Sequence, residues 1–527
     1  MPLSLPSLTR RGFLVAGAAG AAAVAAPGVA RAAAPGRPVG DPFTLGIASG
    51  DPTADGVVLW TRLAVDPLAA DGRGGMPARA FDVQWQVATD ARMANVIRTG
   101  TASARPQAGH SVHVVLTGLE AGRVYFYRFR VGGHVSPTGR TRTAPAPGAQ
   151  VPFTMAVASC AQYEHGWFTA YRRLAEDQPD VVLHLGDYVY EYEKNAYVVE
   201  GGNVRDHAGP ETTTLAGYRQ RHAQYKADQD LQAAHAVAPW VVVWDDHEVD
   251  NNWADEVPEG DQSKEAFLAR RRAAFQAYYE NMPLRPSSLP RGLDMQIYRR
   301  LQWGRLATFH MMDTRQYRSD QACGDGIQVG CEDRLDPARS LPGREQERWL
   351  LDGLGASDAT WDVIGQQVFF ARQDYVVGDT DAYNMDGWDG YVASRNRILR
   401  GIESRGVANP VVLTGDVHSH WANDVKAHFD DPDSRTLGVE LVASSITSGG
   451  DGSDVPSYGP AVLAENPHVK FASNRRGYVR TRVGPRQLQA DFRSLGAVSQ
   501  PGAPVYTQAS FVVEAGNPGL QRVAPAV

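Results

Sequence analysis

Three short runs of polar residues contain side chains of the kinds that bind metal ions. They are Gly186-Asp187-Tyr188-Val189-Tyr190, Trp244-Asp245-Asp246-His247-Glu248-Val249-Asp250-Asn251-Asn252-Trp253 and Thr414-Gly415-Asp416-Val417-His418. An aspartate can bridge two metal ions, and a phenolate oxygen suits a hard trivalent ion such as Fe(III). Taken singly, each run also fits a turn or an acidic surface loop. A shared metal centre explains all three runs at once.

The candidate ligands in these runs differ in their chemistry. Carboxylate and amide oxygens favour hard ions, whereas imidazole nitrogens suit iron or zinc. The second run offers Asp245, Asp246, His247 and Asn252, and the third offers Asp416 and His418. Cys160 follows another apolar run, at a position that matches those of the other candidates. A lone cysteine is usually a small buried hydrophobe, but a thiolate is a ready metal ligand, so we include Cys160 in the candidate centre.

Short apolar runs precede the candidate ligands and predict the strands that position them. These runs cover residues 153–158, 181–185, 240–244, 306–312 and 411–413. Continuous apolar runs of this length fit strands that are buried on both faces, with helices between them. The clearest helical stretches are residues 167–176, 264–282 and 344–354. Open α/β sheets bind ligands at the carboxyl ends of their strands, so the sequence predicts an α/β fold with the site at those ends.

Residues 41–145 show a different pattern, which predicts a small β domain. Val83, Trp85 and Val87 alternate with polar neighbours, and residues 125–131 have the same period of two. Such alternation buries one face of a strand and exposes the other. We expect an all-β sandwich of the immunoglobulin or fibronectin type. Residues 143–150, rich in Ala and Pro, would link it to a larger domain at residues 151–527.

The first 34 residues have the layout of an export signal. The pair Arg10-Arg11 precedes an apolar run at residues 13–26, and small residues suited to a signal peptidase follow at residues 30–34. The pair resembles a twin-arginine signal, whose export machinery carries folded proteins. An amphipathic or disordered N-terminus is the alternative. We expect a secreted, periplasmic or cell-wall protein with no membrane span once residues 1–34 are removed, because no other stretch approaches ~18 consecutive apolar residues.

The net charge indicates which binding partners to expect, and the cysteines indicate the redox state of the compartment in which the protein acts. With 52 basic and 59 acidic residues the formal charge is −7, which argues against a nucleic-acid-binding surface. Of the three cysteines, Cys323 and Cys331 bracket a Gly-rich stretch and are predicted to form a disulfide in an oxidising compartment. This pairing leaves Cys160 as a free thiol.

In this order, the three polar runs resemble the motifs of metallophosphoesterases related to purple acid phosphatases. From residue 41 onward the chain is similar to the PhoD-type family of alkaline phosphatases and phosphodiesterases. Further matching stretches are Ala48-Ser49-Gly50-Asp51-Pro52, Val58-Leu59-Trp60-Thr61-Arg62, Asp313-Thr314-Arg315-Gln316-Tyr317 and Asp386-Gly387-Trp388-Asp389-Gly390-Tyr391. The resemblance implies a metallophosphoesterase β-sandwich flanked by helices as the catalytic domain, preceded by the small β domain. It implies an exported hydrolase of phosphate mono- and diesters.

The resemblance also implies the metals and their ligands. Fe(III) would be bound by Cys160, Asp187, Tyr190 and His418, and Asp187 would bridge to Ca(II), for which the candidate ligands are Asp245, Asp246, Asn252 and Asp416. The family's more usual members carry Asn-His-Glu where this chain has Asp246-His247-Glu248, and Gly-His-x-His where it has Gly415-Asp416-Val417-His418. Both changes place a carboxylate where an amide or imidazole is usual, which favours Ca over Zn as the second ion.

The implied mechanism is in-line attack on phosphorus by a metal-activated water. His247 is the candidate acid for the leaving alkoxide, or a hydrogen-bond donor to the phosphoryl group. Arg315 is a candidate phosphate contact and equally a candidate core residue. Two alternatives stay open: a phospholipase D of the same family, which would act on phospholipids, and a secreted binding protein without catalysis.

Overall fold

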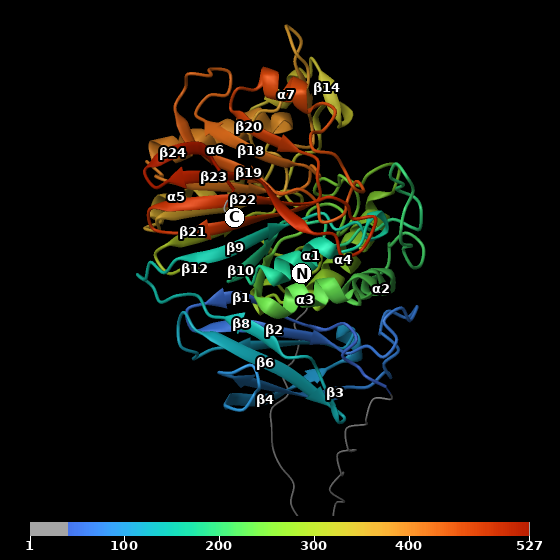
Figure 1. Cartoon of the computed structure of the whole chain (residues 1–527). Helices are drawn as coiled ribbons and strands as arrows, with labels where there is room; N and C mark the ends of the chain where they lie inside the picture. Colours follow the sequence, from blue (N-terminus) through green and yellow to red (C-terminus); the bar gives the residue numbers. More distant parts are fainter. Residues whose placement is uncertain (1–39, 526–527) are drawn as a thin grey trace, which may run out of the picture.

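Two large β-sheets pack face to face at the centre of the molecule (Figure 1). The structure, a computed structural model, describes residues 40–525, so the predicted export signal at residues 1–34 lies outside the described residues. Aromatic side chains from both sheets meet between them. The rings of Phe153 and Phe309 have centroids 6.1 Å apart, and those of Phe471 and Phe492 are 5.1 Å apart. This aromatic interior holds the two sheets against each other.

The larger sheet has ten strands and the smaller has seven. In hydrogen-bonded order the ten are β24 (Asn517–Val523), β23 (Val505–Glu514), β22 (Gln487–Leu495), β21 (Gly477–Val483), β9 (Phe153–Ala158), β10 (Val181–His184), β11 (Pro239–Val242), β1 (Ile47–Thr53), β2 (Gly56–Arg62) and β5 (Ser111–Leu116). The seven are β12 (Arg299–Trp303), β13 (Ala307–Met311), β15 (Trp361–Gly365), β17 (Pro410–Thr414), β19 (Thr436–Val442), β18 (His420–Lys426) and β20 (Val469–Ser473). Together they form the expected β-sandwich.

The strands predicted from apolar runs include all the parallel strands that precede candidate ligands. β9, β10 and β11 pair in parallel, with Val182 opposite both Ala156 and Trp240. In the smaller sheet β13, β15 and β17 are also parallel. Nearly every residue of these strands is buried, because the sandwich covers one face and helices cover the other. The residues that follow the carboxyl ends are therefore free to gather at one edge of the sandwich.

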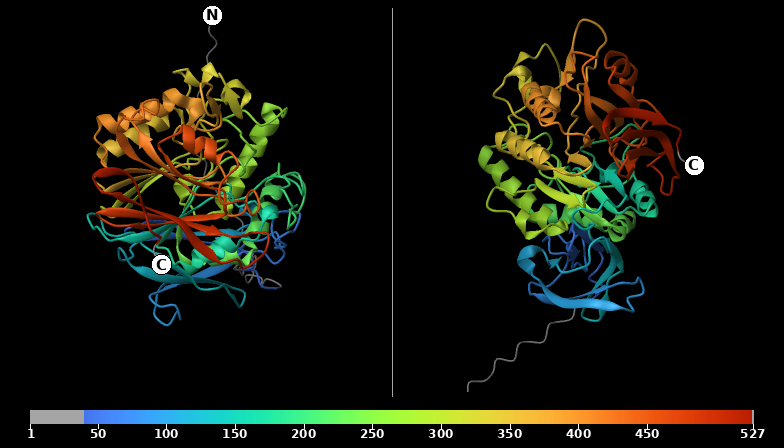
Figure 2. Two further views of the ribbon diagram at one scale, coloured as in Figure 1. Left: turned by 45° about the horizontal axis from the view of Figure 1, so that its top comes forward. Right: turned by 90° about the vertical axis from the view of Figure 1, so that its left-hand side faces the viewer.

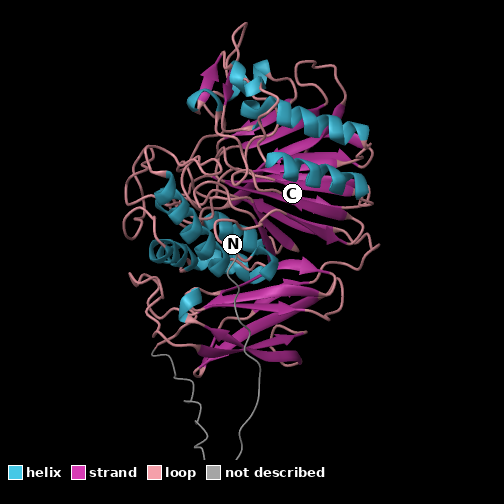
Figure 3. Ribbon diagram, turned by 180° about the vertical axis from the view of Figure 1, so that it is seen from behind, coloured by secondary structure: helices cyan, strands magenta, loops and turns pink. Residues whose placement is uncertain are grey.

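Helices cover the outer faces of the sandwich (Figure 3). α1 (Thr169–Glu176), α3 (Gln229–Val237) and α4 (Lys264–Asn281) contact the larger sheet, with α2 (Leu215–Lys226) packed on α4, while α6 (Val392–Ser404) contacts the smaller sheet with α5 (Gly343–Ala356) beside it. The three predicted helices are confirmed to within two residues at each end. α4 begins where the Ser263 hydroxyl accepts the N–H of Ala266, and it ends just before Pro283.

Among residues 40–525, no helix is long and apolar enough to cross a membrane.

Residues 41–145 lie at one end of the molecule (Figure 2) and contain a hydrophobic core of their own. One layer of this part is the sheet of β4 (Val96–Ala104), β3 (Phe81–Ala88), β6 (Val124–Val131) and β7 (His134–Val135), with β8 (Gly139–Arg142) paired to β6. The alternating residues Val83, Val87 and Phe129 are buried in that core, as their period of two predicts. The other layer is β1, β2 and β5, and β1 pairs in parallel with β11. The small β domain therefore shares a continuous sheet with the rest of the chain.

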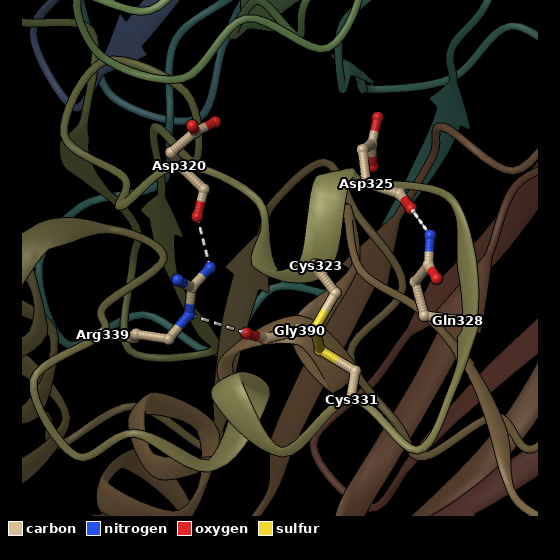
Figure 4. The surroundings of a disulfide bond; sticks show 7 residues. All are labelled: Asp320, Cys323, Asp325, Gln328, Cys331, Arg339 and Gly390. Carbon is tan, nitrogen blue, oxygen red and sulfur yellow. Dashed lines mark hydrogen bonds between the residues drawn. A yellow bond between two sulfur atoms is a disulfide. The ribbon is translucent and has the colours of Figure 1, made fainter.

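Cys323 and Cys331 form the predicted disulfide, with Cα atoms 6.1 Å apart (Figure 4). It closes a loop that contains β14 (Ile327–Val329), and β14 pairs with β16 (Ala382–Asn384) outside the loop. Cys160 is the free cysteine, and it is buried.

Replacing Arg299 with Met should destabilise the junction between the N-terminal part and the sandwich. The Arg299 guanidinium lies 2.7 Å from Asp51, whose side chain is 1% exposed, so the variant leaves a buried carboxylate without its cation. We expect a loss of about 3 kcal/mol in the free energy of unfolding, measured by urea denaturation. Arg305→Met is the matched control, because its partner Asp358 is 81% exposed and its loss should cost less than about 1 kcal/mol. Equal small losses in both variants would contradict the role of this ion pair.

Candidate metal centre

The three polar runs and Cys160 meet beyond the carboxyl ends of β9, β10, β11 and β17. Three groups of side chains there have ligand atoms within 4.8 Å of one another: Cys160, Asp187 and His418; Asp187, Asp246 and His247; and Asp245, Asp246 and Asp416. Asp187 belongs to the first two groups, and Asp246 belongs to the last two. The groups therefore form one continuous cluster, with Asp187 between its two ends.

Tyr190 completes the end of the cluster that contains Cys160. Its hydroxyl oxygen lies 2.9 Å from Asp187 Oδ2 and 3.1 Å from His418 Nε2. Burial raises the pKa of the Cys160 thiol and of the Tyr190 phenol well above their usual values, and the carboxylate of Asp187 raises both further. A bound cation opposes this effect, because it stabilises thiolate and phenolate. The structure thus brings together the four side chains that the resemblance assigns to Fe(III).

Three aspartates, Asp245, Asp246 and Asp416, form the other end of the cluster. Within residues 40–525, neither Asp245 Oδ2 nor Asp246 Oδ1 has a hydrogen-bond partner, although both atoms are buried. Burial raises the pKa of Asp245 to about 7, and burial together with the charge of Asp245 raises the pKa of Asp416 well above its usual range. Burying carboxylates is costly unless they are paired or coordinate metals. The residues present therefore fit a hard cation bound among these oxygens.

Arg315 lies among the carboxylates of this end. Its side chain has no exposed surface; it donates to Asp245 Oδ1 at 2.6 Å and forms two hydrogen bonds of 2.8 Å with the carboxylate of Asp386. Its guanidinium is also 3.7 Å from Asp246 and 3.8 Å from Asp416. Although burial by itself raises the pKa of Asp246, Arg315 and His247 lower it below the usual value. Of the two roles considered from the sequence, this geometry supports holding the carboxylates together.

His247 borders the cluster and stacks on Tyr190, with ring centroids 4.1 Å apart. Its Nδ1 lies 2.8 Å from Glu191 Oε2. Burial lowers the pKa of His247, but the carboxylates of Glu191, Asp246 and Asp187 outweigh burial and raise it well above the usual value. Because Nδ1 is occupied by Glu191, Nε2 is the nitrogen that can donate toward a ligand. The ring is thus a positioned hydrogen-bond or proton donor.

The backbone is in an unusual conformation where the candidate ligands leave their strands. Positive φ angles, which non-glycine residues adopt rarely, occur at Cys160, Asp187, Asn252, Asp416 and His418. Such conformations cost energy, and they cluster at functional sites. Gly186 has a φ of 112°, and a Cβ added there would lie 2.4 Å from the Cβ of Asp245. The ends of β10 and β11 can therefore approach closely only because residue 186 is glycine.

Sequence reasoning gave no role to Glu248, which ties two of these strand ends together. Its carboxylate accepts the N–H groups of Asp187 at 3.1 Å, Tyr188 at 2.6 Å and Asp245 at 2.9 Å. Glu248 lies in the second polar run, so its identity was visible. Its function was not, because the three donors belong to residues up to 61 positions away. The roles of Glu191 and Asp386 could not be predicted for the same reason.

The cluster opens into a pocket of about 370 Å³. Its lining residues are Asp187, Tyr192, Ala196, Tyr197, Asp246, His247, Asn251, Asn252, Asp416 and His418. Tyr192 packs edge-on against His247 with centroids 5.3 Å apart, and Tyr197 packs edge-on against Tyr192. A small ligand that enters this pocket therefore meets carboxylates and imidazoles on one side and aromatic rings on the other.

Two family models match the chain. One, described as PhoD-like phosphatase, matches residues 155–492, and the other, described as PhoD-like phosphatase, N-terminal domain, matches residues 28–145. The alkaline phosphatase D of Bacillus subtilis (strain 168) is 52% identical over 484 residues, which cover 92% of this chain and 82% of that protein.

Solved structures agree with these matches. A structure described as that of PhoD superposes with a TM-score of 0.91 at 52% identity, covering 93% of this chain and 94% of that one. A purple acid phosphatase from yellow lupin (Lupinus luteus) seeds has the same fold, with a TM-score of 0.57 at 12% identity over 89% of this chain and 74% of that one. The resemblance inferred from the three polar runs is thus confirmed, and the chain belongs to the PhoD-like phosphatase family.

Proposed function

We propose that this protein is an alkaline phosphatase and phosphodiesterase that hydrolyses phosphate mono- and diesters with Fe(III) and Ca(II) in the cluster described above. PhoD-like phosphatases are metal-dependent phosphoesterases, and the Bacillus relative is named as an alkaline phosphatase. The observation that carries the proposal is the position of Asp187. Its carboxylate lies beside the thiol, phenol and imidazole at one end of the cluster and beside a carboxylate at the other end. The two ends of the cluster differ in chemistry, so they suit two different ions.

The ligand assignment follows from this difference. Fe(III) is assigned to Cys160, Asp187, Tyr190 and His418, and Ca(II) is assigned to Asp245, Asp246, Asn252 and Asp416 with Asp187 as the bridge. When bound, such ions activate a water molecule and neutralise charge on phosphoryl oxygens. The end that offers thiolate, phenolate and imidazole donors suits Fe(III), and the end that offers carboxylate and amide oxygens suits Ca(II).

The chain's own residues supply the remaining chemistry. His247 donates a proton or a hydrogen bond through Nε2, and Glu191 fixes its ring by accepting from Nδ1 at 2.8 Å. Arg315 offsets the repulsion between Asp245 and Asp386 and keeps their oxygens in place. The rings of Tyr192 and Tyr197 limit the width of the pocket around a leaving group.

Export belongs to the same proposal. Residues 1–34 carry the twin-arginine pattern, and a disulfide between Cys323 and Cys331 fits an oxidising compartment. We propose that the protein acts outside the cytoplasm after export of the folded, metal-loaded chain. Phosphate esters, including phospholipids, are the substrate classes that such a location offers.

The proposed activity is tested by assaying the purified exported protein on three substrates: p-nitrophenyl phosphate, bis(p-nitrophenyl) phosphate and phosphatidylcholine. We expect turnover of the first two, with loss on removal of calcium by a chelator and recovery when Ca(II) is restored. Turnover of phosphatidylcholine alone would favour a phospholipase D. No turnover, together with no iron in metal analysis, would favour a binding protein.

Asp187→Asn should lower kcat/KM by at least about 100-fold, because an amide is a poor bridge between two ions. The fold should survive, since the change removes one of several buried carboxylates that repel one another. Steady-state kinetics, metal content and circular dichroism check this, with the exposed Asp261→Asn as the control. A rate close to that of the wild type would show that Asp187 is not the bridge.

Tyr190→Phe should remove a visible absorption band, because a phenolate bound to Fe(III) gives the protein a violet or purple colour. The ring and its apolar contacts remain, so the variant should fold. Tyr192→Phe is the control: it removes a hydroxyl from the same pocket and should leave the band unchanged. Cys160→Ser should change the spectrum differently, since a thiolate also absorbs by charge transfer. A wild-type protein that contains iron but is colourless would rule out phenolate ligation.

A further inference from the structure

Two residues on either side of Cys323 hold Asn252 in place. Gln321 Nε2 donates to the carbonyl oxygen of Asn252 at 2.6 Å. Asn252 Nδ2 donates to Asp325 Oδ2 at 2.7 Å. Because a carboxylate can only accept, Asp325 selects the orientation in which the amide nitrogen of Asn252 faces it. The amide oxygen is then the atom left to bind a cation in the pocket that Asn252 lines.

The backbone of Asn252 is in the left-handed region with a φ of 48°, which asparagine adopts more readily than most non-glycine residues. Its N–H donates to Asp246 Oδ2 at 2.8 Å, so a shift of Asn252 also moves a carboxylate of the cluster. Gln321 links the same region to Asp386, to which it donates at 2.8 Å. Asp325 is thus connected to the metal centre through one amide side chain.

The disulfide fixes the loop that presents Asp325 (Figure 4). The bond joins Cys323 to Cys331, eight positions apart, and Asp325 lies inside the closed loop with a φ of 72°. Within the loop, Gln328 Nε2 donates to the carbonyl oxygen of Asp325 at 2.6 Å. The loop is also held from outside, because its strand β14 forms three residue pairs with β16. Opening the disulfide frees the chain on both sides of Asp325, because so short a strand pair is weak by itself.

We propose that Asp325 is a positioning residue for Asn252, and that the Cys323–Cys331 disulfide makes calcium binding at the centre depend on oxidation of this loop. The proposal rests on the assignment of Asn252 as a Ca(II) ligand in the proposed function. Cys323 is exposed and therefore accessible to a dithiol. In the redox step a dithiol reductant is oxidised to its disulfide, and its two electrons and two protons convert the protein disulfide to two thiols. The oxidised loop then corresponds to the tight-binding state.

The first experiment compares Asp325→Ala with Asp325→Asn in the metal-loaded enzyme. Calcium affinity is measured by isothermal titration after calcium is removed by a chelator, with colour and iron content followed alongside. We expect Asp325→Ala to weaken calcium binding about 10- to 100-fold with the iron band unchanged. Asp325→Asn should restore binding to within about threefold, because its amide oxygen can still accept from Asn252. Asp333→Ala, an exposed aspartate just beyond the loop, is the control and should not change the affinity.

Two results of that comparison would overturn the positioning role. Equal weakening by Asp325→Ala and Asp325→Asn would mean that the charge of Asp325, rather than its hydrogen bond, matters for the cation. Unchanged calcium affinity in both variants would mean that Asp325 supports the loop alone.

The second experiment opens the disulfide. The double variant with Cys323→Ser and Cys331→Ser should bind calcium about tenfold more weakly than the oxidised wild type. Dithiothreitol should weaken the wild type to the same extent, reversibly on reoxidation, and should not weaken the double variant further. Calcium affinity that is the same with the disulfide open and closed, at a temperature well below unfolding, would contradict the redox dependence even if thermal stability falls.

Asn252→Ala separates failure of this inference from failure of the proposed function. If Asn252→Ala leaves calcium affinity unchanged, the ligand assignment is wrong and the positioning role falls with it. If Asn252→Ala weakens calcium binding but Asp325→Ala does not, the assignment stands and the inference alone is overturned.

Discussion

Mutual repulsion between buried carboxylates is the constraint on which the rest of this structure depends. Asp187, Asp245 and Asp246 are buried together beside the partly exposed Asp416, and the pKa values of Asp187, Asp245 and Asp416 are raised, with burial as the main cause. A protein keeps such a group only if cations offset the repulsion. Arg315 supplies one permanent positive charge inside the cluster. The oxygens that lack a partner within residues 40–525 are the ones left for metal ions.

The architecture follows from the need to bring these side chains to one place. Parallel strands end at the same edge of a sheet, and here two sheets, each with a set of parallel strands, contribute to one cluster. Close approach of the strand ends requires Gly186, positive φ angles at five candidate ligands, and Glu248 to accept the freed N–H groups. Local backbone strain is thus compensated by hydrogen bonds from residues distant in sequence.

Support for the centre extends well beyond its ligands. Arg315 and Arg318 hold Asp386, which follows β16, and β16 pairs with β14 of the disulfide loop. The loop in turn contacts Asn252 through Gln321 and Asp325. These hydrogen bonds and ion pairs connect the surface loop to the carboxylate end of the cluster, so a change in the loop can reach the pocket through a few named contacts.

The sequence by itself determined the class of fold, the buried strands that precede the candidate ligands, and the chemical kinds of those ligands, whereas the buried strands β15 and β19 were not predicted. Apolar runs that end in Asp, His or Cys are local patterns, and their short length favours strands that are buried on both faces. Tertiary structure alone decided which side chains share an ion, because spacing along the chain does not give distances between strands in two sheets. It also decided the partners of Arg315, for which the sequence left two roles equally open, and the three donors to Glu248. The pairing of β1 with β11 could not be predicted either. These parallel strands are about 190 residues apart, and their pairing produces no pattern in the sequence of either strand.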